Sequence, residues 1–114
     1  MEDGRVTRAL GVLSGRWNEG GYTVARWATE AGLRVEMLSR LFRRHLATTP
    51  RGHLVRTRLS HAEDLLRESD LPIEAVAASC GFANRFHFTR LYARWRRMGP
   101  AAYRRLRHEL RDGG

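Results

Sequence analysis

The sequence of 114 residues contains no lysine, only one cysteine and no long apolar run, and the last two features each exclude a class of protein. The single cysteine, Cys80, excludes an intrachain disulfide framework and a cysteine-rich zinc site. Because no run of about 18 apolar residues occurs, we expect no transmembrane helix and no membrane partner. The N-terminus opens on acidic residues, without the basic start and apolar segment of a secretory signal. These absences predict a cytoplasmic protein.

Arginine supplies all of the positive charge. The 21 basic residues are all arginine and stand against 12 acidic residues, which gives a formal net charge of +9. GC-rich codon usage is an ordinary explanation for the missing lysine, but the physical consequence is the same. A guanidinium group forms bidentate hydrogen bonds with phosphate and with guanine O6 and N7. A charge this positive on a small chain favours an anionic polymer or an acidic membrane surface as partner, and of these two we expect the polymer.

Two stretches of the sequence repeat each other. In each, apolar residues at i, i+3 and i+4 precede a glycine and another apolar residue, which predicts a short amphipathic helix that ends in a left-handed turn. Further matches follow at an offset of 50 residues, so we infer a duplicated helix–turn–helix unit. The matched positions are Val24/Ile73, Trp27/Val76, Ala28/Ala77, Gly32/Gly81, Leu33/Phe82, Leu38/Phe88, Arg40/Arg90, Phe42/Tyr92, Pro50/Pro100 and His53/Tyr103.

Periodicity and capping residues predict an all-α fold of about seven helices, in which two helix–turn–helix subdomains are joined by a long linking helix. We expect the subdomains over residues 5–49 and 70–111 and the linking helix over residues 50–69. Thr23 is the expected N-cap of the second helix, and residues 112–114 are expected to fray. The helices are predicted over residues 5–17, 24–31, 35–46, 50–68, 72–80, 84–96 and 100–110.

Most apolar and aromatic residues fall on the faces that such helices bury, so we interpret them as core and not as base-stacking groups. Phe86 is the exception, because it falls on an outward face together with Arg90. The predicted core includes Val6, Leu10, Leu13, Trp17, Trp27, Leu38, Leu41, Phe42, Leu46, Leu54, Leu59, Ala62, Leu65, Leu66, Phe82, Phe88, Leu91, Tyr92 and Trp95.

The outward faces of the third and sixth helices carry the predicted base-reading residues. The second helix of such a unit enters the major groove with these faces toward the bases. An arginine there can bridge guanine O6 and N7, Glu36 can accept from a cytosine amine, and Phe86 and Thr89 can contact thymine methyl groups. A solvated charge or a phosphate contact is the alternative for each arginine. The predicted set is Val35, Glu36, Ser39, Arg40 and Arg43, then Arg85, Phe86, Thr89 and Arg90.

Contacts with phosphate are expected from helix N-termini and flanking arginines. The candidates are Thr23, Thr49, Arg51 and Arg97, with Arg85 as a further possibility. A cluster on the last helix is interpreted as a solvated or nonspecific basic face; its members are Arg104, Arg105, Arg107 and Arg111.

No pattern in the sequence points to catalysis. The five histidines have no His-x-x-x-His or His-Glu-x-x-His spacing, and there is no glycine-rich phosphate loop. Cys80 falls on a face expected to be buried. We therefore predict no catalytic residue, no metal site and no cofactor.

Over residues 5–106 the sequence resembles the AraC/XylS family of bacterial transcription regulators. The resemblance rests on R-L-x-x-A-x-x-L-L at Arg58 to Leu66, I-x-x-V-A-x-x-x-G-F at Ile73 to Phe82, F-x-R-x-Y at Phe88 to Tyr92 and G-P-x-x-Y-R at Gly99 to Arg104. It implies sequence-specific binding of double-stranded DNA by two recognition helices in adjacent major-groove segments, with transcriptional control through RNA polymerase. The chain departs from the family pattern where a small capping residue, a small polar residue and two glycines are usual, at Arg34, Phe86, Ala47 and Arg97.

The alternative that stays open is a nonspecific architectural DNA-binding module, or a protein-interaction module, with the same fold. A monomer suffices for bipartite binding, because one chain carries both recognition helices. We expect this protein at the nucleoid. Most members of the family carry a separate effector-binding or dimerisation domain, so the chain is either a compact regulator or a fragment of a longer one.

Overall fold

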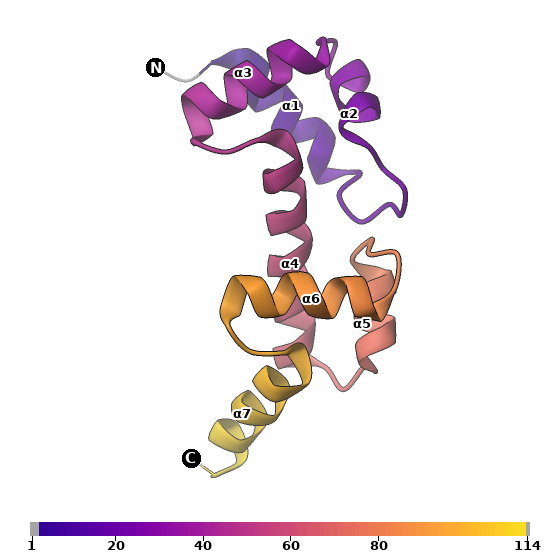
Figure 1. Ribbon diagram of the computed structural model, residues 1–114, viewed down its shortest axis with the longest axis vertical. Coiled ribbons are helices and arrows are strands. Elements are labelled where there is room, and N and C mark those ends of the chain that lie inside the picture. Colours follow the sequence, from indigo (N-terminus) through magenta and orange to yellow (C-terminus); the bar gives the residue numbers. More distant parts are fainter. Residues whose placement is uncertain (1–2, 114) are drawn as a thin grey trace. The chain divides into compact units, whose positions relative to one another are not determined.

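The computed structural model describes residues 3–113, which form seven α-helices and, within that range, no strand. The chain divides between Thr57 and Arg58 into two compact units. No described helix is both long and apolar enough to span a bilayer. The all-α prediction is confirmed, with helices α1 (Gly4–Ser14), α2 (Val24–Glu30), α3 (Val35–Leu46), α4 (Pro50–Glu68), α5 (Ile73–Ser79), α6 (Arg85–Arg96) and α7 (Pro100–Gly113) (Figure 1).

The first unit is built around Trp27, which is completely buried among α1, α2 and α3. Its indole N–H donates to the carbonyl of Ala9 at 2.8 Å, so the buried polar atom is satisfied. Its ring meets Phe42 of α3 edge-on at 5.1 Å, and His53 of α4 meets the same Phe42 at 5.4 Å. Desolvation lowers the pKa of His53, and the nearby charge of Arg56 adds to this effect, so His53 packs as a neutral ring at pH 7.

The turn between the paired helices begins in the same way in both units, although the second turn is one residue longer. Gly32 has a φ of 72°, and the N–H of Leu33 donates to the carbonyl of Ala28 at 2.8 Å. In the second unit Gly81 has a φ of 88°, and Phe82 donates to the carbonyl of Ala77 at 3.0 Å. Positive φ favours glycine, and the six-residue hydrogen bond closes the end of the first helix. The duplication inferred from the sequence is therefore confirmed at the turn.

An aromatic row fills the second unit. Ring centroids are 5.0 Å apart between Phe82 and Phe88 and 5.8 Å apart between Phe88 and Tyr92, while Tyr103 of α7 lies 6.0 Å from Tyr92. The Tyr92 hydroxyl donates to the carboxylate of Glu63 on α4 at 2.8 Å. This bond ties α6 to α4.

Arg96 completes this polar cluster. Its guanidinium donates twice to Glu63, at 2.9 and 3.0 Å, and lies over the Trp95 ring at 3.7 Å from the centroid. Partial burial acts to raise the pKa of Glu63, but the hydrogen bonds from Arg96 and Tyr92 and the charge of Arg96 outweigh it and hold that pKa below its usual value. Glu63 is therefore ionised at neutral pH.

The structure corrects one member of the predicted basic face. Arg104 donates to the carbonyls of Leu66, at 3.2 Å, and Leu71, at 2.6 Å. A helix leaves its last carbonyls without internal partners, and Arg104 satisfies one of them at the end of α4. Its role is structural, and the prediction of a solvated charge was wrong.

Three predictions near helix ends were also wrong. Leu46 is 36% exposed, because α3 ends there and the left-handed Ala47 turns the chain away. The first helix ends at Ser14, so Trp17 packs against the core from the following turn. Helix α7 runs to Gly113, which places Asp112 and Gly113 inside it, while residue 114 lies outside the described range. Four further residues of the predicted core are only half-buried: Leu10, Leu65, Leu91 and Trp95.

Candidate nucleic-acid interface

Helix α3 presents one buried and one open face. Leu38, Leu41 and Phe42 are buried, and they fix the rotation of the helix in the first unit. The opposite side, which we name the outer face of α3, consists of the residues predicted to read bases. Ser39 is half-buried there and the others are exposed: Val35, Glu36, Arg40 and Arg43. The predicted stripe thus lies on one accessible helix face.

Helix α6 repeats this arrangement in the second unit. Phe88 and Tyr92 are buried, and the outer face of α6 contains Arg85, Phe86, Thr89 and Arg90. Thr89 is half-buried and the other three are exposed. The side chain of Asn84 caps the helix by accepting from the N–H of His87 at 2.9 Å. In contrast, Arg34 occupies the N-cap position of α3 and makes no capping hydrogen bond.

The arginines of the outer faces differ from those that hold the scaffold. Arg26 pairs with Glu19 at 2.8 Å, Arg67 with Asp64 at 2.8 Å and Arg96 with Glu63 at 2.9 Å. Within residues 3–113, by contrast, no carboxylate pairs with an arginine of either outer face: Arg40, Arg43, Arg85 or Arg90. Four exposed guanidinium groups are therefore available to an external anion or hydrogen-bond acceptor.

The predicted phosphate contacts lie at helix ends. Thr23 caps α2 by accepting from the N–H of Arg26 at 3.1 Å, as the sequence predicted, and Thr49 accepts from Gly52 at the start of α4 at 3.0 Å. Each hydroxyl proton can still be donated. Arg51 is exposed in the first turn of α4, and Arg97 is exposed just after α6. Phosphate binding by these four residues stays a prediction.

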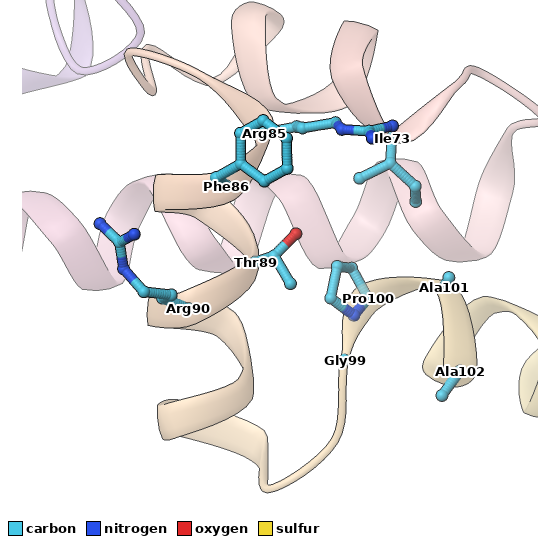
Figure 2. Close-up of a pocket in the computed structure, with 9 residues that line it drawn as sticks. All are labelled: Ile73, Arg85, Phe86, Thr89, Arg90, Gly99, Pro100, Ala101 and Ala102. Carbon is cyan, nitrogen blue, oxygen red and sulfur yellow. The ribbon is translucent and has the colours of Figure 1, made fainter.

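A cleft of about 470 Å³ lies beside the outer face of α6 (Figure 2). Arg85, Phe86, Thr89 and Arg90 form one side, and the start of α5 and the start of α7 form the rest. The sequence alone does not reveal this cleft, because the residues that close it are distant from α6 along the chain and only the fold brings them together. They are Ile73, Gly99, Pro100, Ala101 and Ala102.

Groups that could perform chemistry are buried or scattered. Cys80 is completely buried, and desolvation raises the pKa of its thiol to about 11, so it is no nucleophile at neutral pH. Among residues 3–113, no three histidine, cysteine, aspartate or glutamate side chains gather in a way that could hold a metal ion. The candidate interface is thus a pair of helix faces that offer arginine, one carboxylate and one aromatic ring.

Comparison with known proteins decides the family. A family described as "Helix-turn-helix domain" matches residues 27–106, which is most of the chain. The chain belongs to the AraC/XylS family. Members of this family are DNA-binding transcription regulators and not enzymes, which agrees with the lack of a catalytic pattern.

Among curated AraC/XylS relatives, the chain is 36% identical over 88 residues to the HTH-type transcriptional regulator CdhR of Pseudomonas aeruginosa, a match of 77% of the chain and 26% of CdhR. It is 40% identical over 67 residues to the transcriptional activator RhaS of Escherichia fergusonii, a match of 59% of the chain and 24% of RhaS. The chain therefore spans about a quarter of the length of the curated relatives that it matches.

Solved structures of the family share the whole fold. The DNA-binding domain of AdpA, a global transcriptional factor solved in complex with a target DNA, matches with a TM-score of 0.88 and 26% identity over 96% of this chain and 97% of that domain. An AraC-type regulator from Chromobacterium violaceum matches with a TM-score of 0.83 and 26% identity, over 91% of this chain and 92% of the other. Seven helices in this order are thus the fold of an AraC-type DNA-binding domain.

Proposed function

We propose that this AraC/XylS domain binds double-stranded DNA sequence-specifically and regulates transcription, with α3 and α6 as recognition helices in two successive major-groove segments. The observation that carries the proposal is the pair of matched outer faces. Each is set by the same turn and the same buried positions, and each keeps arginines without an ion-pair partner among residues 3–113.

The side chains on these faces suit the base edges of the major groove. Arg40 and Arg90 occupy equivalent positions and are the candidates for bidentate contact with guanine, which is the commonest specific protein–DNA contact. Glu36 repels phosphate, so it favours an amine donor such as cytosine N4. Thr23, Thr49, Arg51 and Arg97 would hold the backbone and set the register of the domain.

Selection from a random duplex library at near-physiological salt tests the proposal, followed by fluorescence anisotropy on the enriched duplex and on a scrambled one. We expect two short enriched boxes about one helical turn, or ~34 Å, apart. Arg40→Ala should relax the base preference in one box and Arg90→Ala in the other, and each should weaken binding about 5- to 150-fold. Both residues are exposed, so folding should be unchanged.

Arg107→Ala is the matched control. It removes the same charge from an exposed residue of α7 that belongs to neither outer face, so base preference should be unchanged. Equal affinity for the enriched and scrambled duplexes would overturn sequence specificity. In that case, a steep fall of affinity with salt would support the nonspecific architectural alternative, and an absence of binding would support the protein-interaction alternative.

We also propose that the domain binds its DNA site as a monomer and has RNA polymerase as a second partner. One chain carries both recognition helices, so a monomer should bind an asymmetric site, and sedimentation of the protein–DNA complex should give one chain per duplex. RNA polymerase as a second partner and a location at the nucleoid follow from the proposed role in transcription. A requirement for two chains per enriched duplex would overturn the monomer assignment.

A further inference from the structure

Phe86 exposes more of its surface than any other large apolar residue within 3–113, at 63%. A single exposed apolar side chain needs no explanation by itself, but Phe86 lines the cleft beside α6 together with Ile73, Thr89 and Pro100. Apolar surface is therefore concentrated on the outer face of the helix that, under the proposed function, enters the major groove.

The Phe86 ring is in contact with the side chain that precedes it in the sequence. The guanidinium of Arg85 lies over the ring, 5.0 Å from its centroid, in a cation–π contact. Figure 2 shows the Arg85 side chain reaching across the cleft toward Ile73, with Thr89 between Phe86 and Pro100. A cation thus lies close to the ring, and the Thr89 side chain lies about one helical turn further along the same outer face, with its methyl group toward Pro100.

Major-groove chemistry decides what such a ring can recognise. The edges of the base pairs present hydrogen-bond donors and acceptors, and the C5-methyl group of thymine is the apolar exception. A ring pressed against N7, O6 or an exocyclic amine would dehydrate that group without replacing its hydrogen bond, which is unfavourable. Contact with a methyl group carries no such cost and removes apolar area from water.

We infer that Phe86 is a specificity-determining residue that selects a 5-methylpyrimidine in the box read by α6. Thymine is the ordinary source of this group, and 5-methylcytosine carries the same methyl at the same place in the groove. The inference rests on the proposed function, because it requires α6 to enter the major groove. Arg85 and Arg90 flank the ring and supply the positive charge that draws the duplex to it.

The equivalent position in the first unit makes the inference sharper. Glu36 of α3 stands 50 residues before Phe86 of α6 and occupies the equivalent position in the repeat. Under the proposed function, α3 therefore presents a carboxylate, and α6 a ring, to equivalent base pairs of the two DNA boxes. A carboxylate accepts from an amine, and a ring contacts a methyl group. The two boxes should therefore differ in sequence, and the complete site should have a direction.

The test compares the wild-type chain with Phe86→Ser and Phe86→Leu in parallel library selections. The base pair that faces residue 86 is the one whose preference is lost with Phe86→Ser and retained with Phe86→Leu. We expect thymine there. In the highest-affinity duplex selected by the wild-type chain, replacing that thymine with uracil removes only the methyl group. Wild-type affinity should fall about fivefold, which corresponds to about 1 kcal/mol, and Phe86→Ser should bind both duplexes equally.

Duplexes with cytosine or 5-methylcytosine at the same position test whether the methyl group is recognised only in thymine or also in 5-methylcytosine. Tighter wild-type binding to 5-methylcytosine than to cytosine, lost in Phe86→Ser, would show that the methyl group is recognised in either base. Tighter binding to thymine alone, still sensitive to uracil, would restrict the site to thymine.

Two results would overturn the inference and leave bipartite binding intact. One is equal wild-type affinity for the thymine and uracil duplexes, and the other is a motif that Phe86→Ser leaves unchanged. Failure of the wild-type chain to enrich any box would overturn the proposed function, and the inference with it. Circular dichroism should be the same for all three chains, since the ring is exposed.

Discussion

The two units share a left-handed glycine after the first helix and the pattern of buried positions on the second, but they hold that second helix in different ways. In the first unit, α3 packs through Phe42 against Trp27 and His53, and its N-terminus has no side-chain cap. In the second, Asn84 caps α6, and the polar cluster of Glu63, Tyr92 and Arg96 ties it to α4. The common features place an outer face in each unit, whereas the supporting contacts differ. Duplication has therefore preserved the geometry of the helix pair, and the contacts that stabilise it have diverged.

The largest expected difference between the two units is the loss of stability when a central core residue is replaced by alanine. Trp27 is completely buried, so Trp27→Ala should lower the free energy of unfolding by about 3–5 kcal/mol through lost contacts and a cavity. Val76 is its equivalent and is also completely buried, but Val76→Ala removes fewer atoms and should cost about 1–3 kcal/mol. Urea denaturation followed by circular dichroism measures both. Equal costs would contradict the idea that the first unit depends on a single large residue.

The polar cluster gives the next largest effect. Glu63→Gln keeps the side-chain volume but removes the negative charge and one of the two oxygens that accept from Arg96 and Tyr92. It should cost about 1–2 kcal/mol at pH 7, less than a fully buried pair because Arg96 is half exposed. Glu68→Gln is the matched control, because Glu68 pairs with Arg67 at the surface and should change stability by less than about 0.5 kcal/mol.

Low pH should abolish the difference in stability between the wild-type and Glu63→Gln chains. The pKa of Glu63 is lowered in the folded chain, so its contribution is present above the ordinary value of 4.5 and is lost as pH falls through the lowered one. The wild-type and Glu63→Gln chains should therefore converge in stability once the pH falls below the lowered pKa of Glu63. A difference that persists at low pH would mean that shape, and not charge, stabilises the cluster.

Substitutions at the N-caps of α3 and α6 should change stability by a smaller amount, and in opposite directions in the two units. Arg34→Ser supplies α3 with the hydroxyl cap that it lacks and should stabilise the chain by about 1 kcal/mol. Asn84→Ala removes the cap of α6 and should destabilise it by a similar amount. Thermal melting measures both, and Arg34→Ala is the control for the lost charge. Equal stability of the Arg34→Ser and Arg34→Ala chains would contradict a capping role at this position.

Local features were predictable from the sequence. The duplicated turn, the cap at Thr23 and the faces of α3 and α6 depend on spacing within one or two helices, which periodicity reports directly. The prediction for Leu46 was wrong because the pattern of one helix does not show where the chain turns away after it.

Contacts between distant residues were not predictable. The bonds from Tyr92 and Arg96 to Glu63 join positions 29 and 33 residues apart, and nothing in either segment marks its partner. The cleft beside α6 has the same origin, since Ile73 and Pro100 reach Phe86 only through the packing of three helices. The candidate base-reading residues could be proposed from the sequence because each set lies on one face of its own helix, whereas the apolar surroundings of Phe86 required the fold.

The smallest expected effect lies at the C-terminal ends of α3 and α6, where both units depart from the glycine usual in the family. Ala47 has a φ of 54° and Arg97 a φ of 64°, so each holds a left-handed conformation that is unfavourable for a residue with a Cβ atom. Ala47→Gly and Arg97→Gly should each stabilise the chain by about 0.5–1 kcal/mol in thermal melting. Gly32→Ala is the reverse control, because φ there is 72°, and it should destabilise by about 1 kcal/mol. Arg97→Gly should in addition weaken DNA binding without changing the base preference, whereas Ala47→Gly should change only the stability of the chain. That outcome would mean that the charge of Arg97 contributes to phosphate binding, at a backbone position that glycine would occupy more favourably.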